Sequence, residues 1–190
     1  LVAPVVEESA KALAIVGVLL IRRRQFNGVV DGIVFAGLSG LGFAFAENIL
    51  YLGSAFLDGG IVGAVLTFVL RCVMGPFAHP MFTAATGIGI GLAVRTNSVP
   101  LKIVYPLTGL LVAMLLHSLW NFLASIGGTG DWFLSYLVVQ LPIFIGFVTF
   151  AIFVMRREAK LITQHLRVYA DTGWITGQEL AMLASPSGRR

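Results

Sequence analysis

Long apolar runs, each ended by a short polar or basic segment, dominate this chain of 190 residues. A run of about 20 apolar residues is long enough for a helix to cross a bilayer. Within the runs the residues do not alternate between apolar and polar, as they would in the strands of a membrane barrel. The pattern therefore predicts an all-α protein, a polytopic bundle of transmembrane helices.

The runs predict about five spans within residues 1–155. We place these helices over residues 3–21, 29–58, 77–94, 103–125 and 132–155. The apolar stretch from Gly60 to Val94 is too long for one span, because it would extend about 52 Å as a helix against a hydrocarbon core of about 30 Å. Gly75-Pro76 is its natural break. We therefore expect a broken helix there, with a half-length or surface-lying helix over residues 61–74.

Residues 156–190 are polar enough for solvent and are expected to form a short, soluble helical tail. Within this tail, Thr176 is followed three residues later by Glu179, the spacing of a capping box at the start of a helix. At its other end the chain lacks an initiator Met and begins inside an apolar helix. We therefore expect that an N-terminal part with further helices precedes it in a longer protein.

The composition supports a membrane location. Hydrophobic residues make up 57% and charged residues 12% of the chain, about half the charged fraction of a soluble domain. The net charge of +4 does not indicate nucleic-acid binding, because the basic residues lie at the ends of apolar runs. Membrane lipid is thus an expected partner and nucleic acid is not. Cys72 is the only cysteine, which excludes an intrachain disulfide and a thiolate cluster.

The basic residues also predict the orientation, since Lys and Arg are enriched in cytoplasmic loops. If residues 60–94 cross the membrane once, three basic clusters fall on one side. These clusters are Arg22–Arg24, Arg95 with Lys102, and Arg156-Arg157. The opposite loops carry Asp58 and Asp131 and no basic residue. We expect the basic side, including the tail, to be cytoplasmic.

Glu47 is a carboxylate inside an otherwise apolar run. Such a group costs a few kcal/mol or more unless it faces other protein or water. Gly37, Gly40, Ala44 and Glu47 follow one another at helical spacing and form one stripe. Small residues on a stripe let a neighbouring helix approach closely. We therefore expect Glu47 to face other helices.

Four of the predicted helices carry ionisable groups at a similar depth. Counted from its cytoplasmic end at helical rise, Glu7 lies about 22 Å up, Glu47 about 28 Å, His79 about 24 Å and His117 about 22 Å. Asn121 follows His117 by four residues, so the two share one face. We expect all five side chains to meet in the extracytoplasmic half of the bilayer.

These residue types suit hydrolysis. An imidazole and an amide on one face, here His117 and Asn121, can donate two hydrogen bonds to a developing oxyanion. Carboxylates in a cavity can act as general bases toward water, and two glutamates with two histidines could instead hold a divalent metal. Taken singly, Glu47 fits a structural contact between helices as well as chemistry, and a lone His79 or His117 fits such a contact better. Glu7-Glu8 could be an anchor at the membrane interface, and Arg71 fits a snorkelling or ion-paired residue better than a catalytic one.

Four motifs, in order, closely resemble the PrsW family of intramembrane proteases, which is related to the CAAX prenyl endopeptidases. Any one motif alone would be weak, whereas the ordered set is specific and covers most of the membrane part. The motifs are EESAK with Glu7, Glu8 and Lys11, FAFAEN with Glu47 and Asn48, FAHPMFT with His79, and HSLWN with His117 and Asn121.

The resemblance implies a proteolytic membrane core in which Glu7 or Glu8, with Glu47, activates water. It implies that His79, His117 and Asn121 position the water and stabilise the oxyanion. We assign supporting roles to the side chains of Lys11, Asn48 and Arg71. The implied substrate is a transmembrane or membrane-anchored protein in a bacterial plasma membrane, cut near the extracytoplasmic side, as with anti-sigma-factor-like regulators.

Two further expectations complete the sequence analysis. The absence of an HExxH motif or a cysteine ligand set favours chemistry without a cofactor, with zinc left open. The rival functions are a proton-coupled carrier, because buried Glu and His also form proton relays, and a non-catalytic membrane scaffold. A carrier would show an internal repeat of broken helices, and only one such break is visible, at Gly75-Pro76.

Overall fold

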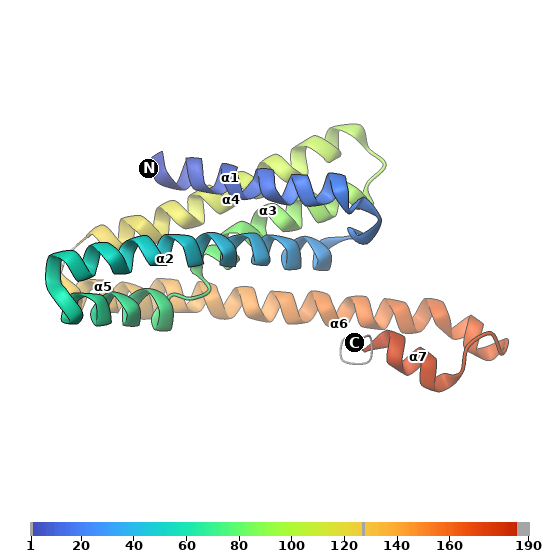
Figure 1. Cartoon of the computed structure of the whole chain (residues 1–190). Helices are drawn as coiled ribbons and strands as arrows, with labels where there is room; N and C mark the ends of the chain where they lie inside the picture. Colours follow the sequence, from blue (N-terminus) through green and yellow to red (C-terminus); the bar gives the residue numbers. More distant parts are fainter. Residues whose placement is uncertain (1, 127, 186–190) are drawn as a thin grey trace. The chain divides into compact units, whose positions relative to one another are not determined.

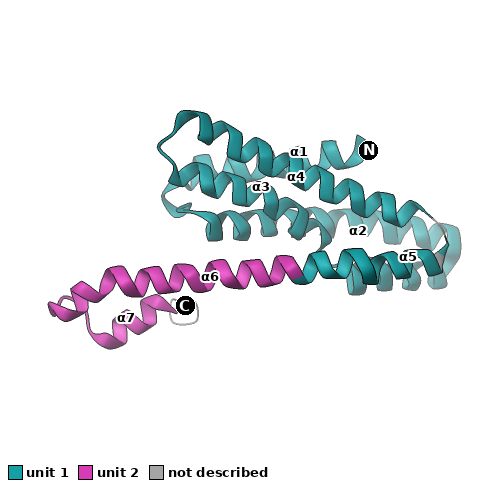
Figure 2. Cartoon of the chain, turned by 180° about the vertical axis from the view of Figure 1, so that it is seen from behind, with its two compact units in different colours: residues 1–145 teal, residues 146–190 magenta. Residues whose placement is uncertain are grey.

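A computed structural model describes residues 2–126 and 128–185. The chain divides into two compact units, residues 1–145 and residues 146–190 (Figure 2). The described residues are helical and contain no strand, which confirms the all-α prediction. Three stretches are long and apolar enough to cross a membrane, residues 29–95, 99–125 and 130–171. The first of them contains more than one helix, and the count of about five spans stays a prediction.

The first unit holds the helices that build the site. They are α1 (Val2–Ile21), α2 (Val29–Phe68), the π-helical segment η2 (Val69–Met74), α3 (Ala78–Arg95), α4 (Val99–Ser125), α5 (Thr129–Ser135), the π-helical segment η3 (Tyr136–Gln140) and the start of α6 (Leu141–Asp171). A short 3-10 turn, Arg23–Gln25, links α1 to α2. The second unit holds the rest of α6 and α7 (Gly177–Ala184).

The chain reverses direction inside α2, at Gly60. This residue has φ 61° and ψ −153°, a conformation that residues other than glycine rarely adopt. The part of α2 after Gly60 runs back beside the part just before it (Figure 1), so closely that a Cβ on Gly63 would lie 2.5 Å from the Ala55 carbonyl oxygen. The second predicted helix thus ends where expected. Residues 61–74 are helical as predicted, α-helical to Phe68 and π-helical over Val69–Met74.

The predicted break at Gly75-Pro76 is also confirmed. Segment η2 ends at Met74 and α3 begins at Ala78. The end of α3 returns to the beginning of α2, since a Cβ on Gly28 would lie 3.1 Å from Arg95 Cδ. Residues 61–95 therefore cross the bundle once, which brings Arg95 to the same end as the Arg22–Arg24 cluster.

Helix α3 packs between α2 and α4 through small residues. A Cβ on Gly40 of α2 would lie 2.7 Å from Pro80 Cα in α3, and a Cβ on Gly109 of α4 would lie 2.5 Å from the Ala85 carbonyl oxygen. Close approach of this kind is how membrane helices gain packing contacts without a hydrophobic driving force. It brings the polar side chains of α2, α3 and α4 within reach of one another.

The predicted stripe on α2 needs one correction. Gly40 and Ala44 are buried as expected and Glu47 faces other helices, but a Cβ on Gly37 would meet nothing within 4 Å. The buried stripe instead continues through Ala36 and Gly32. The spacing of four residues between its members places Gly37 one position beyond the contact face, about 100° around the helix.

The tail contains the predicted capping box. The Glu179 backbone N–H donates to the Thr176 hydroxyl over 3.1 Å, and the Thr176 backbone N–H donates to Glu179 Oε2 over 2.7 Å. The Thr176 hydroxyl also donates to Glu179 Oε2, over 3.0 Å. The bonds that Thr176 donates, first from its backbone N–H and then from its hydroxyl, hold the pKa of the exposed Glu179 carboxyl below its usual value. Helix α6 continues past Met155, the predicted end of the last span, and stops only at Asp171.

Gly40→Ala and Gly37→Ala form a matched pair that tests this packing. At Gly40 the new methyl group must push against the α3 backbone, so we expect a loss of about 1–3 kcal/mol in the free energy of unfolding. At Gly37 there is open space, and the change should be neutral or stabilising by up to about 1 kcal/mol. Denaturation of the detergent-solubilised protein measures both, and equal effects would contradict the α2–α3 contact.

Candidate active site

Glu8 is the most enclosed carboxylate of the site, with 0% of its surface exposed. Lys11 Nζ donates to its Oε1 over 2.7 Å, and the Thr83 hydroxyl donates to its Oε2 over 2.9 Å. His117 Nδ1 lies 2.9 Å from the same Oε1. Both carboxylate oxygens are therefore engaged by α1, α3 and α4. Glu8 acts as a fixed acceptor in the wall of the bundle.

Glu7 is turned differently from its neighbour. It lines a cavity between the helices, and its Oε2 is buried without a hydrogen-bond partner among the described residues. This oxygen lies 3.7 Å from Lys11 Nζ and 3.7 Å from His117 Nε2. A buried oxygen left without a partner is unfavourable, so Glu7 is the carboxylate that has a vacant acceptor for a ligand.

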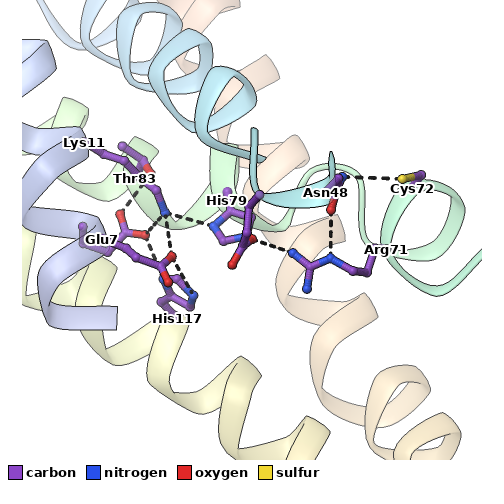
Figure 3. Close-up of polar contacts among 10 residues, drawn as sticks. Glu7, Lys11, Asn48, Arg71, Cys72, His79, Thr83 and His117 are labelled. Carbon is purple, nitrogen blue, oxygen red and sulfur yellow. Dashed lines mark hydrogen bonds and ion pairs between the residues drawn. The ribbon is translucent and has the colours of Figure 1, made fainter. Parts of the chain in front are cut away.

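His79 lies between Lys11 and Glu47 and connects them (Figure 3). Its Nδ1 lies 2.9 Å from Lys11 Nζ and its Nε2 lies 2.9 Å from Glu47 Oε2. An ammonium group only donates hydrogen bonds, so Nδ1 accepts from Lys11 and the proton of the neutral ring is on Nε2. His79 thereby donates to Glu47, and Lys11 determines which imidazole tautomer is present.

Glu47 is held from a second direction by an ion pair with Arg71. The guanidinium donates to Glu47 Oε2 through one terminal nitrogen and to Asn48 Oδ1 through Nε over 2.8 Å. Asn48 in turn donates to Cys72 Sγ over 3.5 Å, and the guanidinium carbon lies 3.8 Å from the centre of the Tyr51 ring. Of the two structural interpretations of Arg71, snorkelling and an ion pair, the ion pair is the one present.

Aromatic rings hold the two imidazoles in place. The His79 and His117 rings meet edge to face, with centroids 4.9 Å apart. Phe82 stacks on His117 at 5.1 Å, and Phe43 lies 5.5 Å from His79 and 4.0 Å from Lys11 Nζ. Packing on several sides restricts the rotation of each imidazole, which keeps its nitrogens directed at their partners.

A cavity of about 570 Å³ opens beside this network. The polar side chains that line it come from α1, α2, η2, α3 and α4. They are Glu7, Glu47, Asn48, Arg71, His79, His117 and Asn121. Trp120, Trp132 and Tyr51 contribute aromatic walls. The cavity is large enough for a short peptide segment together with water.

The structure brings together the ionisable residues that similar depth had predicted to meet. Glu7, Glu8, Lys11, His79, His117 and Glu47 form one connected network, and Asn121 lines the same cavity. The sequence analysis missed Thr83, Phe82 and Tyr51. Thr83 and Tyr51 had a usable signal, since each follows a predicted site residue, His79 and Glu47, by four positions on the same helix.

Glu7, His79 and His117 also form a donor set for a metal ion. Each offers one ligand atom, and these atoms lie within 4.8 Å of one another. Two imidazoles and a carboxylate suit zinc. Glu8 bonded to Nδ1 of His117 is the outer carboxylate that orients a ligating imidazole. The unpartnered Glu7 oxygen fits such an ion, whereas His79 would have to give up its bond to Glu47 or to Lys11.

The fold and the site together define a helical membrane protein with an internal carboxylate–histidine centre. Residues 1–147 match the family described as PrsW family intramembrane metalloprotease. The chain belongs to this family, which confirms the resemblance found in the sequence motifs.

Two bacterial relatives named Protease PrsW illustrate the relationship. The protein from Clostridioides difficile (strain 630) is 30% identical over 142 residues, which are 75% of this chain and 57% of the relative. The protein from Oceanobacillus iheyensis is 29% identical over 140 residues, 73% of this chain and 57% of the relative. The chain thus spans little more than half the length of these relatives. No solved structure matches it.

The role of Glu8 in stability is tested by Glu8→Ala beside Thr83→Val. Removing the carboxylate leaves Lys11 buried with one partner fewer, and we expect a loss of about 3–5 kcal/mol in the free energy of unfolding. Thr83→Val removes one hydrogen bond and should cost about 1 kcal/mol. Denaturant titration in detergent gives both values. A Glu8→Ala protein as stable as Thr83→Val would contradict the central position of Glu8.

Proposed function

We propose that this chain is the core of an intramembrane endopeptidase that hydrolyses peptide bonds of membrane-bound proteins. The observation that carries the proposal is the cavity inside the membrane bundle, because Glu7, Glu47, His79 and His117 all line it. Peptide hydrolysis needs a base for water and donors for the oxyanion. The family to which the chain belongs supports the same reaction.

Each residue then has a distinct role. Glu47 takes the proton of the attacking water, held in position by His79 on one side and Arg71 on the other. Asn121, one turn beyond His117, donates its amide to the developing oxyanion. These groups are available without rearrangement of the helices, because all of them already line one cavity.

Glu7, His79 and His117 would hold a divalent metal, for which zinc is the proposed identity. When bound, such an ion supplies Lewis-acid polarisation of the peptide carbonyl. Glu8 fixes the His117 ring through Nδ1, and Lys11 offsets part of the negative charge of Glu7 and Glu8. The sequence motifs favoured chemistry without a metal, whereas we propose the zinc-dependent alternative. The unpartnered Glu7 oxygen and the family description both support that alternative.

We further propose that the basic end of the bundle faces the cytoplasm of a bacterial cell. Arg95 lies at the end where α1 meets α2, and Lys102 follows shortly after it. Basic residues favour the cytoplasmic side. Glu7 lies near the opposite end of α1, so the cavity would be in the extracytoplasmic half of the membrane. The substrates we propose are membrane-anchored regulators such as anti-sigma factors, and the tail after residue 155 would be cytoplasmic.

Glu47→Ala should abolish cleavage of a single-pass membrane reporter by the purified protein. Loss of the general base is expected to lower the rate about 100- to 10,000-fold, with the protein still folded and in the membrane. Asp58→Ala is the matched control, because Asp58 is an exposed carboxylate on the same helix. Retained cleavage by Glu47→Ala would refute its assignment. A wild type that cleaves none of several reporters would favour a carrier or scaffold.

Metal dependence is tested separately. We expect a strong chelator to stop cleavage by the wild type and added zinc to restore it. The metal content of the purified protein, measured by elemental mass spectrometry, should fall in His117→Ala and in Glu7→Ala but stay unchanged in Asp58→Ala. Cleavage that survives chelation, with no bound metal, would instead assign the water to the carboxylates alone.

A further inference from the structure

Gln140 is a buried amide that nothing in the described structure satisfies. Only 4% of the residue is exposed, and neither Nε2 nor Oε1 has a hydrogen-bond partner among the described residues. Gln140 ends the π-helical segment η3, a conformation that often occurs at functional sites. Burial of a primary amide without partners is unfavourable. A ligand that pairs with the amide would remove this penalty.

Gln140 lines a second cavity, of about 180 Å³, which we call the Gln140 pocket. Its remaining walls are mostly apolar side chains: Val73, Met74, Phe77, Met81, Leu141 and Phe144. Four residues line both this pocket and the larger cavity: Gly75, Pro76, Ala78 and Trp120. The Gln140 pocket therefore adjoins the proposed active site along the broken helix.

Two contacts attach η3 and α6 to that broken helix. The Tyr136 hydroxyl donates to the Met74 carbonyl oxygen over 2.9 Å, just before the break. Phe77, just after the break, stacks on Phe144 of α6 with ring centroids 5.8 Å apart. These contacts hold the walls of the pocket together before and after the break. Both contacts lie within residues 1–145, one compact unit, so they fix the position of the pocket relative to the active-site cavity.

The chemistry of the pocket matches an extended peptide. A peptide bond inside a helix is shielded, so a protease in the membrane must bind its substrate locally unwound. Unwinding leaves backbone N–H and C=O groups without partners, and in a membrane these groups need protein partners. A glutamine amide offers both a donor and an acceptor. A lipid acyl chain could fill the apolar pocket but would leave the Gln140 amide without a hydrogen-bond partner.

We propose that the Gln140 pocket is a substrate subsite. Its apolar walls receive one apolar side chain of the peptide near the scissile bond, and the Gln140 amide pairs with the adjacent peptide backbone. Gln140 is thus a binding and positioning residue outside the four family-like motifs. The inference rests on the proposed proteolytic function, because it identifies the occupant as the substrate of that reaction.

Gln140→Leu tests the subsite, since it keeps an apolar side chain of similar size and removes the amide. We expect kcat/KM for a membrane reporter to fall about tenfold, the effect of one lost hydrogen bond in a buried site. The thermal midpoint should be unchanged or higher, because an unpaired buried amide has been removed. Gln178→Leu, on the exposed face of the tail, is the matched control and should change neither quantity.

A set of reporter peptides with single ester bonds identifies the pairing. An ester lacks the N–H donor, so the wild type should lose about tenfold in kcat/KM at one position near the scissile bond. At that position Gln140→Leu should cause no further loss, as expected when two changes remove the same interaction. An unchanged kcat/KM in Gln140→Leu, or equal losses on all amide and ester reporters, would overturn the proposal.

Binding separates this proposal from the proposed reaction. A labelled reporter peptide is titrated onto Glu47→Ala protein and onto the Glu47→Ala, Gln140→Leu double variant. Weaker binding by the double variant, by about tenfold, supports the subsite even if the wild type cleaves no reporter. Equal binding by the two proteins, together with cleavage by the wild type, overturns the subsite and leaves the proposed reaction intact.

Discussion

The buried ion pair between Glu8 and Lys11 is the interaction on which the rest of the site depends. Charges buried inside a membrane bundle, away from water, must be paired and hydrogen-bonded. Lys11 meets Glu8 and His79, while Glu8 meets Thr83 and His117. One pair thus links α1 to α3 and α4, and it sets the orientation of both imidazoles.

The pair also explains why two adjacent glutamates differ in function. Consecutive residues on a helix point about 100° apart, so Glu8 turns into the wall while Glu7 lines the cavity. Both oxygens of Glu8 are already bonded to protein groups, whereas Oε2 of Glu7 has no hydrogen-bond partner among the described residues. Glu8, with both oxygens hydrogen-bonded, therefore has a structural role. Glu7, one residue earlier on the same helical turn, is the carboxylate left for chemistry.

The backward turn at Gly60 and the break at residues 75–77 bring the segment over residues 61–74 to the site. The segment between them carries Arg71 to Glu47. The same break provides the wall shared by the active-site cavity and the Gln140 pocket. Irregular backbone at membrane depth is tolerated where it lines a protein cavity, and here it lies beside both cavities.

The sequence by itself determined the helical class, the broken helix, the capping box of the tail and most of the ionisable residues that meet in one network. These follow from local rules, because run length, glycine and proline breaks, and helical rise depend on neighbouring residues only. The tertiary structure alone decided which glutamate faces the cavity, that Gly37 lies off the contact stripe, and that the Gln140 amide has no hydrogen-bond partner in the described part of the chain. Those facts depend on how each helix is rotated against its neighbours, and packing between distant segments sets that rotation.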